Sequence, residues 1–186
     1  MNNQKMEVIE KWFEKKEHPI LEMMRTALIT SVVVGVVSLF VRPVVVNGDS
    51  MNDTLHNGDK LMMVCRGYEL TYDDIVVLYS NGYQKQLIKR VIGMGGDTID
   101  IDFESGTVTR NGEVLDEPYI KELTYTDEGA FEYPVTVPEN CLFVMGDNRN
   151  DSSDSRRPEI GFVTYEELKG KVIFRYSPIN MFGDVY

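Results

Sequence analysis

Residues 85–103 read KQLIKRVIGMGGDTIDIDF, in which two apolar runs are separated by the glycine-rich stretch 93–96. Short runs of this kind, rich in β-branched residues and bounded by glycine and aspartate, are typical of β-strands. The same pattern continues on both sides, from residue 44 to residue 177. The other runs are VVVNG, DKLMMVCR, DIVVLYS, GTVTRNGEVL, PVTVPENCLFVMGDN and GKVIFRYS. This part of the chain is therefore expected to consist mostly of strands.

Two local signals refine this expectation. Asn111-Gly112, between TVTR and EVL, is typical of a two-residue type I′ hairpin turn. Thr164, with Glu167 three residues later and Gly170 at the end, predicts one short helix over YEELKG. We expect residues 43–186 to form an antiparallel β domain that is strongly coiled or barrel-like, so that the fold class is mainly β with an N-terminal transmembrane helix.

Residues 26–41 read TALITSVVVGVVSLFV, sixteen uncharged residues in a row. A helix that crosses the hydrocarbon core of a bilayer needs about 20 residues. Arg25 and Arg42 flank the run and can extend it by placing their charges at the interface. We interpret residues 25–42 as a membrane anchor. The alternatives are a buried core helix and a cleaved signal peptide, although no small-x-small cleavage site follows the run.

The basic residues around this segment predict its orientation. Five Lys or Arg side chains precede it, and three follow within the next 25 residues, namely Arg42, Lys60 and Arg66. Short segments rich in Lys and Arg stay in the cytoplasm. Residues 1–24 are therefore expected to be cytoplasmic, with an amphipathic helix that ends before Pro19, and residues 43–186 to be extracytoplasmic. Membrane lipid is accordingly an expected partner.

The charge of the chain excludes one class of partner. The net charge is −11, and the first 46 residues carry +1, so the remaining 140 residues carry −12. Nucleic-acid binding needs clustered Lys and Arg, which this acidic body lacks. Cys65 and Cys141 form no CxxC pair and have no histidine at metal-ligand spacing, so no metal site is expected. The two thiols either form a disulfide or remain free.

Four Gly-Asp clusters stand out: GDSMNDTL at 48–55, GDK at 58–60, KRVIGMGGD at 89–97 and GDNRNDSSDSRR at 146–157. Taken singly, each is typical of a turn. The first contains Ser50, which needs a base before it can act as a nucleophile. His18 precedes the anchor, whereas His56 lies near Ser50 in sequence. Lys89 lies in an apolar run, and burial there would favour its neutral form, the form that can accept a proton.

The order of these clusters resembles the conserved boxes of bacterial type I signal peptidases. The matching residues are Ser50-Met51, Thr54-Leu55, Gly58-Asp59, Lys89 to Gly93, and Gly146 to Arg149 followed by Ser152, Asp154, Ser155 and Arg156. The resemblance extends from residue 27 to about residue 178 and includes the N-terminal anchor. It is greatest to the compact, single-anchor branch found in Gram-positive bacteria. The resemblance implies a serine endopeptidase without a cofactor, whose partners are secretory pre-proteins.

The resemblance also implies roles for individual residues. Ser50 would attack the scissile carbonyl, Lys89 would act as general base, and Ser152 would orient the lysine amine. The backbone N–H of Ser50 would form part of the oxyanion hole, and Gly48 stands where many relatives have a serine hydroxyl as the second donor. Two ion pairs, Asp147 with Arg90 and Asp154 with Arg156, would brace the site. Two prolines usual in the family are replaced here, by Asp53 and Gly95.

Apolar strand segments on either side of Ser50 and Lys89 predict where a substrate binds. An extended peptide could pair with these strands while its alternate side chains enter pockets. Signal peptides end in small residues at alternate positions, so shallow pockets would select them. The residues expected at this site are Val44, Val46, Leu55, Leu87 and Ile88.

Two other readings remain open at this stage. Self-cleaving repressor peptidases share a similar Ser–Lys fold, but they are soluble and many carry a DNA-binding domain. An anchored relative that binds pre-proteins without cleaving them is the alternative outside the enzymes. The interpretation favoured by the sequence is a membrane-bound signal peptidase that cleaves after small-x-small motifs.

Overall fold

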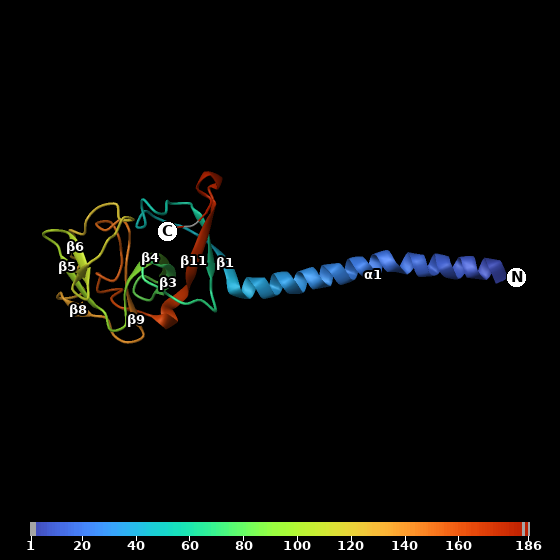
Figure 1. The fold of residues 1–186 in the computed structure, drawn as a ribbon, viewed down its shortest axis with the longest axis horizontal. Coiled ribbons are helices and arrows are strands. Elements are labelled where there is room, and N and C mark those ends of the chain that lie inside the picture. The colour runs from blue at the N-terminus through green and yellow to red at the C-terminus, as the bar shows by residue number, and fades with distance from the viewer. Residues whose placement is uncertain (1–2, 184, 186) are drawn as a thin grey trace. The chain divides into compact units, whose positions relative to one another are not determined.

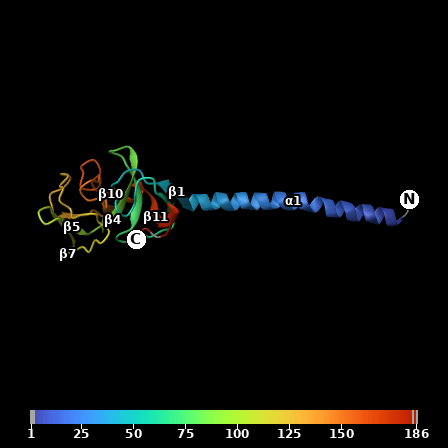
Figure 2. The same ribbon diagram turned by 90° about the horizontal axis from the view of Figure 1, so that it is seen from above.

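The structure, a computed structural model, describes residues 3–183 and 185, apart from the side chains at 3, 9, 10 and 12–18. It divides into two compact units, Met1–Phe40 and Val41–Tyr186. The first contains one helix and the second contains all the strands (Figures 1 and 2).

The helix α1 runs from Asn3 to Phe40 and continues through Pro19. The expected end before Pro19 is therefore wrong. A proline inside a helix removes one backbone hydrogen bond, and the helical turns on both sides hold the chain in register across that single loss. The amphipathic character expected of residues 1–24 depends largely on side chains at 9, 10 and 12–18, which lie outside the described ones.

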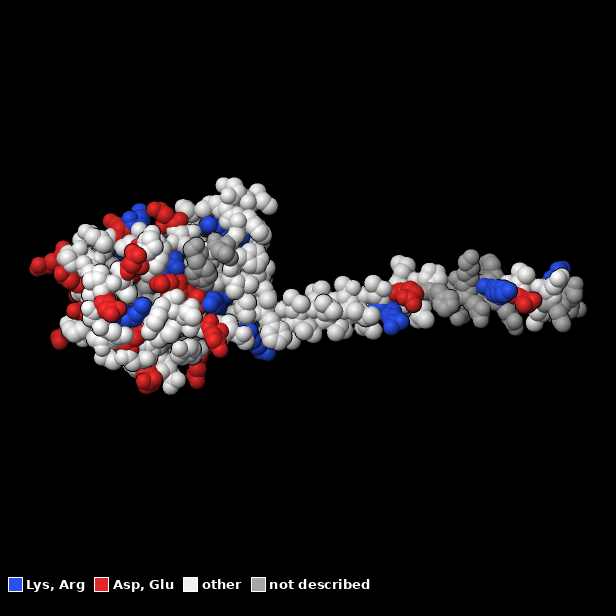
Figure 3. Space-filling view, in the orientation of Figure 1, with Lys and Arg blue, Asp and Glu red and all other residues white. Residues whose placement is uncertain are grey.

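The segment Pro19–Phe40 is 22 residues long and is apolar enough to cross a membrane, judged by length and composition. None of its side chains is buried in the protein, and Figure 3 shows a stretch of the helix without charged side chains. Three of its hydroxyls are satisfied within the helix, because Thr26, Ser31 and Ser38 each donate to the carbonyl four residues earlier at 2.8 Å. An apolar surface of this kind is compatible with anchoring in a membrane.

The second unit is built from antiparallel strands, which confirms the expected fold class. The larger sheet has the order β1-β2-β11-β3-β4-β9-β10 and the smaller one β7-β6-β5-β8. The strands of the larger sheet are β1 (Val41–Val45), β2 (Lys60–Val64), β3 (Ile75–Ser80), β4 (Lys85–Met94), β9 (Cys141–Met145), β10 (Val163–Thr164) and β11 (Leu168–Ser177). Those of the smaller sheet are β5 (Thr98–Asp102), β6 (Thr107–Arg110), β7 (Glu113–Val114) and β8 (Val135–Thr136).

The larger sheet is strongly curled but open. Within the described residues its pairing ends at β1 on one side and β10 on the other, so it does not close into a barrel. One groove is nevertheless lined by residues of both β1 and β4, although three strands separate these two in the hydrogen-bonding order. The sheet must therefore bend back on itself, as the twist of antiparallel strands allows.

The local turn signals are partly confirmed. Asn111 and Gly112 have φ angles of 55° and 83° and join β6 to β7, as a type I′ turn requires. The helix predicted over YEELKG is only one 3₁₀ turn, Tyr165–Glu167, capped by Thr164 and Glu167. Leu168 already belongs to β11, because strand pairing with β3 replaces further helical turns there.

Three apolar clusters form the core of this unit. One lies beneath the segment that carries Ser50 and includes Val46, Met51 and Leu55. A second packs between β3, β4 and β9, and a third packs against the smaller sheet. Cys65 and Cys141 are both free and half-buried, so of the two alternatives for the thiols the structure has the unpaired one.

Candidate active site

The turn that carries Ser50 is anchored from below and from its flanks. Met51 and Leu55 are 1% and 0% exposed and pin the turn into the core. Gly48 has a φ of 105°, a conformation that favours glycine, and its N–H donates to Asn57 Oδ1 at 3.1 Å. Ser50 itself is half-buried and faces the groove. The nucleophile expected from the sequence is thus held on a fixed turn.

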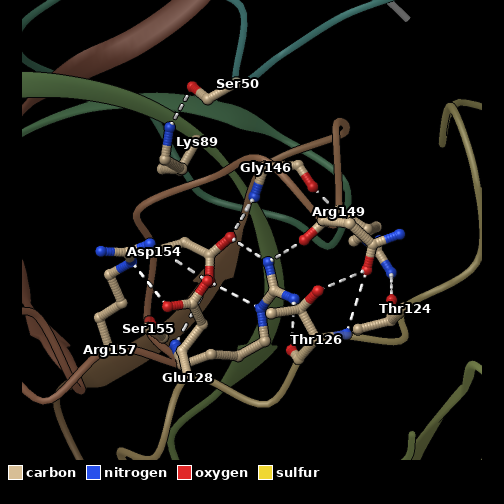
Figure 4. A network of polar contacts seen from close by, with 12 residues as sticks. Ser50, Lys89, Thr124, Thr126, Glu128, Gly146, Arg149, Asp154, Ser155 and Arg157 are labelled. Atoms are coloured by element: carbon tan, nitrogen blue, oxygen red, sulfur yellow. Dashed lines mark hydrogen bonds and ion pairs between the residues drawn. The ribbon is translucent and has the colours of Figure 1, made fainter.

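Strand β4 brings Lys89 to Ser50. The Lys89 amine donates to Ser50 Oγ at 2.6 Å and to the carbonyl of Ile88 at 2.8 Å (Figure 4). Lys89 is only 2% exposed. Burial lowers the pKa of Lys89 to about 8, although the negative charges of Asp154 and Asp147 act in the opposite direction. A lysine with such a pKa is partly neutral near physiological pH, which is what a general base requires.

A fully buried ion pair joins Arg90, the residue that follows Lys89, to Asp147. Two parallel hydrogen bonds join the groups, at 2.8 Å from Nε and 2.6 Å from Nη2. The guanidinium also lies over the ring of Tyr119, 3.9 Å from its centroid, and Thr54 Oγ1 donates to the same carboxylate. These contacts connect β4 to the segment that follows β9.

A second buried ion pair joins Asp154 to Arg156, with hydrogen bonds of 2.9 and 2.8 Å. The carboxylate also accepts from the N–H of Gly146 at 2.9 Å (Figure 4). Burial alone would raise the pKa of Asp154, but the charge of Arg156 and the hydrogen bonds to the carboxylate lower it below the usual range. The Arg156 guanidinium further donates to the carbonyl of Arg149 at 2.6 Å. Both ion pairs expected from the sequence are therefore present.

Ser152 lies close to the Ser50 turn, and its hydroxyl is buried. No hydrogen bond from this hydroxyl to the Lys89 amine is found within the described residues, and the hydroxyl contributes to the lowered pKa of Asp154. A Cβ added at Gly146 would overlap both Ser152 Oγ and the carbonyl oxygen of Ser50. Gly146 therefore lets the Ser50 turn and the Ser152 side chain approach each other.

A groove of about 650 Å³ runs past Ser50 and Lys89. Four of the five residues expected to bind substrate line it, namely Val44, Val46, Leu87 and Ile88. Leu55 does not line the groove, because it is completely buried in the core beneath the Ser50 turn. The expectation that Leu55 lines a pocket is corrected on this point.

The strand edges beside the groove are free. Within the described residues β1 pairs only with β2, and residues 85–89 of β4 pair only with β3, because β9 pairs with β4 from Arg90 onward. Each edge therefore has backbone groups on one side that face no other strand. An extended peptide placed in the groove could hydrogen-bond to them.

Four more residues complete the comparison between sequence and structure. Two of them, His56 and Asp53, were considered in the sequence, and the other two, Glu117 and Asn148, have contacts that the sequence did not predict. His56 is exposed, and no hydrogen bond of its ring to Ser50 is found in the described chain. Asp53 is exposed. Glu117, which pairs with the buried Arg149, has no motif around it that could have signalled this role. Asn148 belongs to the Gly-Asp cluster 146–157. Membership in that cluster is the one sequence signal that could have pointed to its contact with the Ser50 turn.

Gly95, one of the two residues that depart from the pattern of the resemblance, packs closely. A Cβ there would lie 3.1 Å from the Glu139 Cα and the Pro138 carbonyl oxygen. No group of three or more metal-ligating side chains is found in residues 3–183 and 185.

Comparison with known proteins places the chain among peptidases. The model of the family described as "Signal peptidase, peptidase S26" matches residues 20–177. The chain is 36% identical to "Signal peptidase I S" of Bacillus subtilis over 176 residues, covering 89% of this chain and 93% of that protein. It is 38% identical to "Signal peptidase I" of Bacillus caldolyticus over 169 residues, covering 81% and 88%. A crystal structure of a signal peptidase I from Enterococcus faecalis aligns with a TM-score of 0.48 at 30% identity, covering 57% of this chain and 98% of that one.

The buried Asp154–Arg156 ion pair predicts that substitutions of the adjacent Arg156 and Arg157 differ strongly in their effect on stability. Arg156→Met leaves Asp154 buried without its partner and should destabilise the protein by about 3–5 kcal/mol. Arg157 pairs with Glu128 but its side chain is 36% exposed, so Arg157→Met should change stability by about 1 kcal/mol or less. Thermal and denaturant unfolding of the purified full chain in detergent measure both. Equal effects of the two substitutions would contradict the role given to the Asp154–Arg156 pair.

Proposed function

The chain belongs to the peptidase S26 family of signal peptidases, and we propose that it is a membrane-anchored serine endopeptidase in which Ser50 is the nucleophile and Lys89 the general base. Membership in the family supports peptidase activity and the cleavage of signal peptides from secreted pre-proteins. The observation that carries the residue assignment is the 2.6 Å hydrogen bond between Lys89 Nζ and Ser50 Oγ, made by a lysine that is buried.

The proton transfer follows from the state of Lys89. An unperturbed lysine is neutral in fewer than about one molecule in a thousand at pH 7. With a pKa of about 8, roughly one molecule in ten holds a neutral amine at that pH. The neutral amine takes the Ser50 proton while Oγ attacks the scissile carbonyl, and it later activates the water that releases the acyl group.

The developing negative charge needs donors beside Ser50. Within the described chain the N–H of Ser50 donates no hydrogen bond, so it is free to serve as one donor. The N–H of Gly48 is already bonded to Asn57 Oδ1, and glycine has no hydroxyl, so Gly48 supplies no donor in this arrangement. Ser152, whose hydroxyl is buried beside Gly146 near the Ser50 turn, is proposed to orient the lysine once substrate is bound.

Substrate recognition is proposed to follow from the groove. A signal peptide would lie extended between the free edges of β1 and β4, with alternate side chains directed toward Val44, Val46, Leu87 and Ile88. We expect the groove to present shallow pockets that admit only small side chains, and signal peptides carry such side chains at alternate positions before the cleavage site. The enzyme is therefore proposed to cleave after small-x-small motifs.

The membrane arrangement is part of the same proposal. The anchor, residues 25–42, falls mostly within the apolar segment Pro19–Phe40 and would span the bilayer, with residues 1–24 in the cytoplasm and residues 43–186 outside, as the distribution of Lys and Arg indicates. Signal peptides are themselves membrane-inserted, so an anchored protease would meet them at the bilayer surface. Membrane lipid is a proposed partner, and nucleic acid is not, because the body is acidic.

Ser50→Ala should lower signal-peptide cleavage about a thousandfold or more, since no other group forms the covalent intermediate. The assay uses the purified full chain in detergent and a pre-protein with an Ala-x-Ala cleavage site. Ser105→Ala, in the exposed turn before β6, is the control and should retain wild-type activity. Replacing the last alanine of the substrate site with leucine should block cleavage. Turnover by Ser50→Ala at the wild-type rate would reject the proposal.

The pKa of Lys89 predicts opposite effects of one substitution on activity and stability. The kcat/KM of the wild type should rise with pH around a midpoint near 8. Lys89→Met should abolish cleavage but stabilise the fold by up to about 3 kcal/mol at neutral pH, because the folded state no longer disfavours a proton that the unfolded state holds with a pKa near 10.5.

The stabilisation by Lys89→Met should depend on pH. Below the folded pKa both states hold the proton, and the full penalty of burying the charge destabilises the wild type. As pH rises from about 8 toward 10.5 the folded protein loses the proton first, so the penalty fades and the advantage of Lys89→Met should shrink. Lys169→Met, at an exposed position of β11, and His56→Asn should leave the midpoint unchanged. A basic limb that disappears with His56 would contradict the assignment of Lys89.

The proposed orientation predicts protease sensitivity. A protease added to intact cells stripped of their wall should degrade residues 43–186 and leave residues 1–24 protected, because the bilayer shields only the cytoplasmic side. An epitope at each end of the chain is followed by immunoblot after protease treatment, before and after detergent lysis. The epitope that survives in intact cells marks the cytoplasmic end. Protection of the C-terminal epitope with loss of the N-terminal one would reverse the topology.

A further inference from the structure

Asn148 contacts the Ser50 turn in two places. Its side-chain amide donates from Nδ2 to the carbonyl oxygen of Asp49 at 3.1 Å, and its backbone N–H donates to the carbonyl oxygen of Ser50, also at 3.1 Å. Only the NH₂ of an asparagine side chain can donate, so the partner fixes which way the amide points. Asn148 is 3% exposed. One buried residue therefore holds the peptide groups on both sides of the nucleophile.

The first of these contacts bears on the oxyanion donor. The carbonyl of Asp49 and the N–H of Ser50 belong to one planar peptide group, which is trans here. In a trans peptide the two bonds point in opposite directions. A donor held on the Asp49 oxygen therefore fixes the direction of the Ser50 N–H, the group left without an internal hydrogen bond.

Asn148 is itself held rigidly by its neighbours. The preceding residue, Asp147, is paired with Arg90, and the following residue, Arg149, is paired with Glu117 and donates to the Gly146 carbonyl at 3.1 Å. The carbonyl of Asn148 accepts from the N–H of Asp151 at 3.0 Å. A side chain mounted between two buried ion pairs has little freedom to follow the Ser50 turn, so it can impose an orientation on it.

We propose that Asn148 is a positioning residue for the reaction, which holds the Asp49–Ser50 peptide so that the Ser50 N–H points at the developing oxyanion. This inference rests on the proposed role of Ser50 as nucleophile. The N–H of Asn52 also donates to the Asp49 carbonyl, at 3.0 Å, so loss of the Asn148 amide leaves the peptide held by one donor instead of two. The expected result is a misaligned oxyanion donor in a turn that remains folded.

The effect on catalysis should be intermediate in size. Complete loss of an oxyanion donor lowers kcat by about 100- to 1,000-fold. Asn148→Ala should lower kcat by about 10- to 100-fold, because the donor is present but poorly directed. KM should change by less than about threefold, because the groove residues that hold the extended peptide are untouched. The pH midpoint set by Lys89 should stay where it is.

A matched pair of inhibitors separates positioning from a purely structural role. A signal-peptide fragment that ends in Ala-x-Ala as an aldehyde adds to Ser50: the bond from Oγ to the carbonyl carbon forms, the carbon–oxygen π bond breaks, the hydroxyl proton moves to Lys89 and the carbonyl oxygen becomes an oxyanion. The same peptide ending in an amide binds the groove without this step. The ratio of the two inhibition constants therefore measures oxyanion stabilisation.

The test compares full-length variants in detergent, each assayed above the midpoint of its own pH profile. Asn148→Ala and the nearly isosteric Asn148→Asp should reduce the preference for the aldehyde by about 10- to 100-fold and leave amide binding unchanged. Asn150→Ala is the control, since Asn150 makes the same kind of contact, from Nδ2 to the Leu123 carbonyl at 2.9 Å, away from the Ser50 turn. It should change thermal stability but not the inhibitor ratio.

The outcomes separate this inference from the proposed function. If either folded Asn148 variant keeps the wild-type kcat and aldehyde preference, or if Asn150→Ala alters the preference equally, Asn148 does not position the donor. That result leaves the role of Ser50 intact. If Ser50→Ala keeps both cleavage and the aldehyde preference, the proposed nucleophile is wrong, whatever the Asn148 variants do.

Discussion

The burial of the Lys89 amine against Ser50 is the constraint on which the rest of the site depends. A charged ammonium is disfavoured in a poorly solvated place, so burial moves the proton equilibrium toward the free amine. The surroundings must then exclude water without supplying a direct carboxylate partner, which would restore the charge. The contacts of the Lys89 amine meet this condition, since within the described residues it donates to a hydroxyl and to a backbone carbonyl. Asp147 and Asp154 are near enough to oppose the shift, but both are already bonded to arginines.

The strand arrangement provides that environment. Strand β4 is paired on both sides at Arg90, with β3 and with β9, but residues 85–89 have one open edge beside the groove. Lys89 is thus the last residue of β4 that pairs with β3 alone, directly before the part of the strand that pairs on both sides. Its stem is surrounded by the sheet while its amine reaches the Ser50 turn. In the proposed mechanism, a peptide bound at this open edge would place its scissile bond beside the lysine and the serine, so that substrate binding and proton transfer would share one structural feature.

The parts that could be predicted from the sequence are those with short-range signals. These are the strand runs, the Asn111-Gly112 turn and the ordered clusters around Ser50 and Lys89. Each depends on residues close together in the sequence, so each could be recognised without knowing what packs against it. Two predicted helix ends were wrong because longer-range structure overrides local preference. The helix continues through Pro19 because helical turns flank it on both sides, and Gly170 lies in β11, which pairs with β3, instead of ending a helix. Leu55 and Glu117 show the remaining limit. Whether an apolar side chain lines a groove or fills the core, and which acid meets a buried arginine, depends on contacts between residues far apart in the chain.

The buried cations of this unit divide into two kinds, and the division explains how one fold can hold both stable and reactive charges. Arg90, Arg149, Arg156 and Arg175 each lie against a carboxylate, and a guanidinium keeps its proton under all ordinary conditions, so these pairs can only brace the structure. Lys89 has a lower intrinsic affinity for its proton and, within the part of the chain that the structure describes, makes no ion pair, so burial can shift it toward the neutral form. The segment 146–156 contributes two of these arginines, the two aspartates whose charges raise the pKa of Lys89, and the asparagine that contacts the Ser50 turn. One segment, braced by buried ion pairs, therefore carries both the charges that act on the Lys89 amine and the side chain that holds the Asp49–Ser50 peptide, so the proposed base and the proposed backbone donor would be aligned by the same part of the chain.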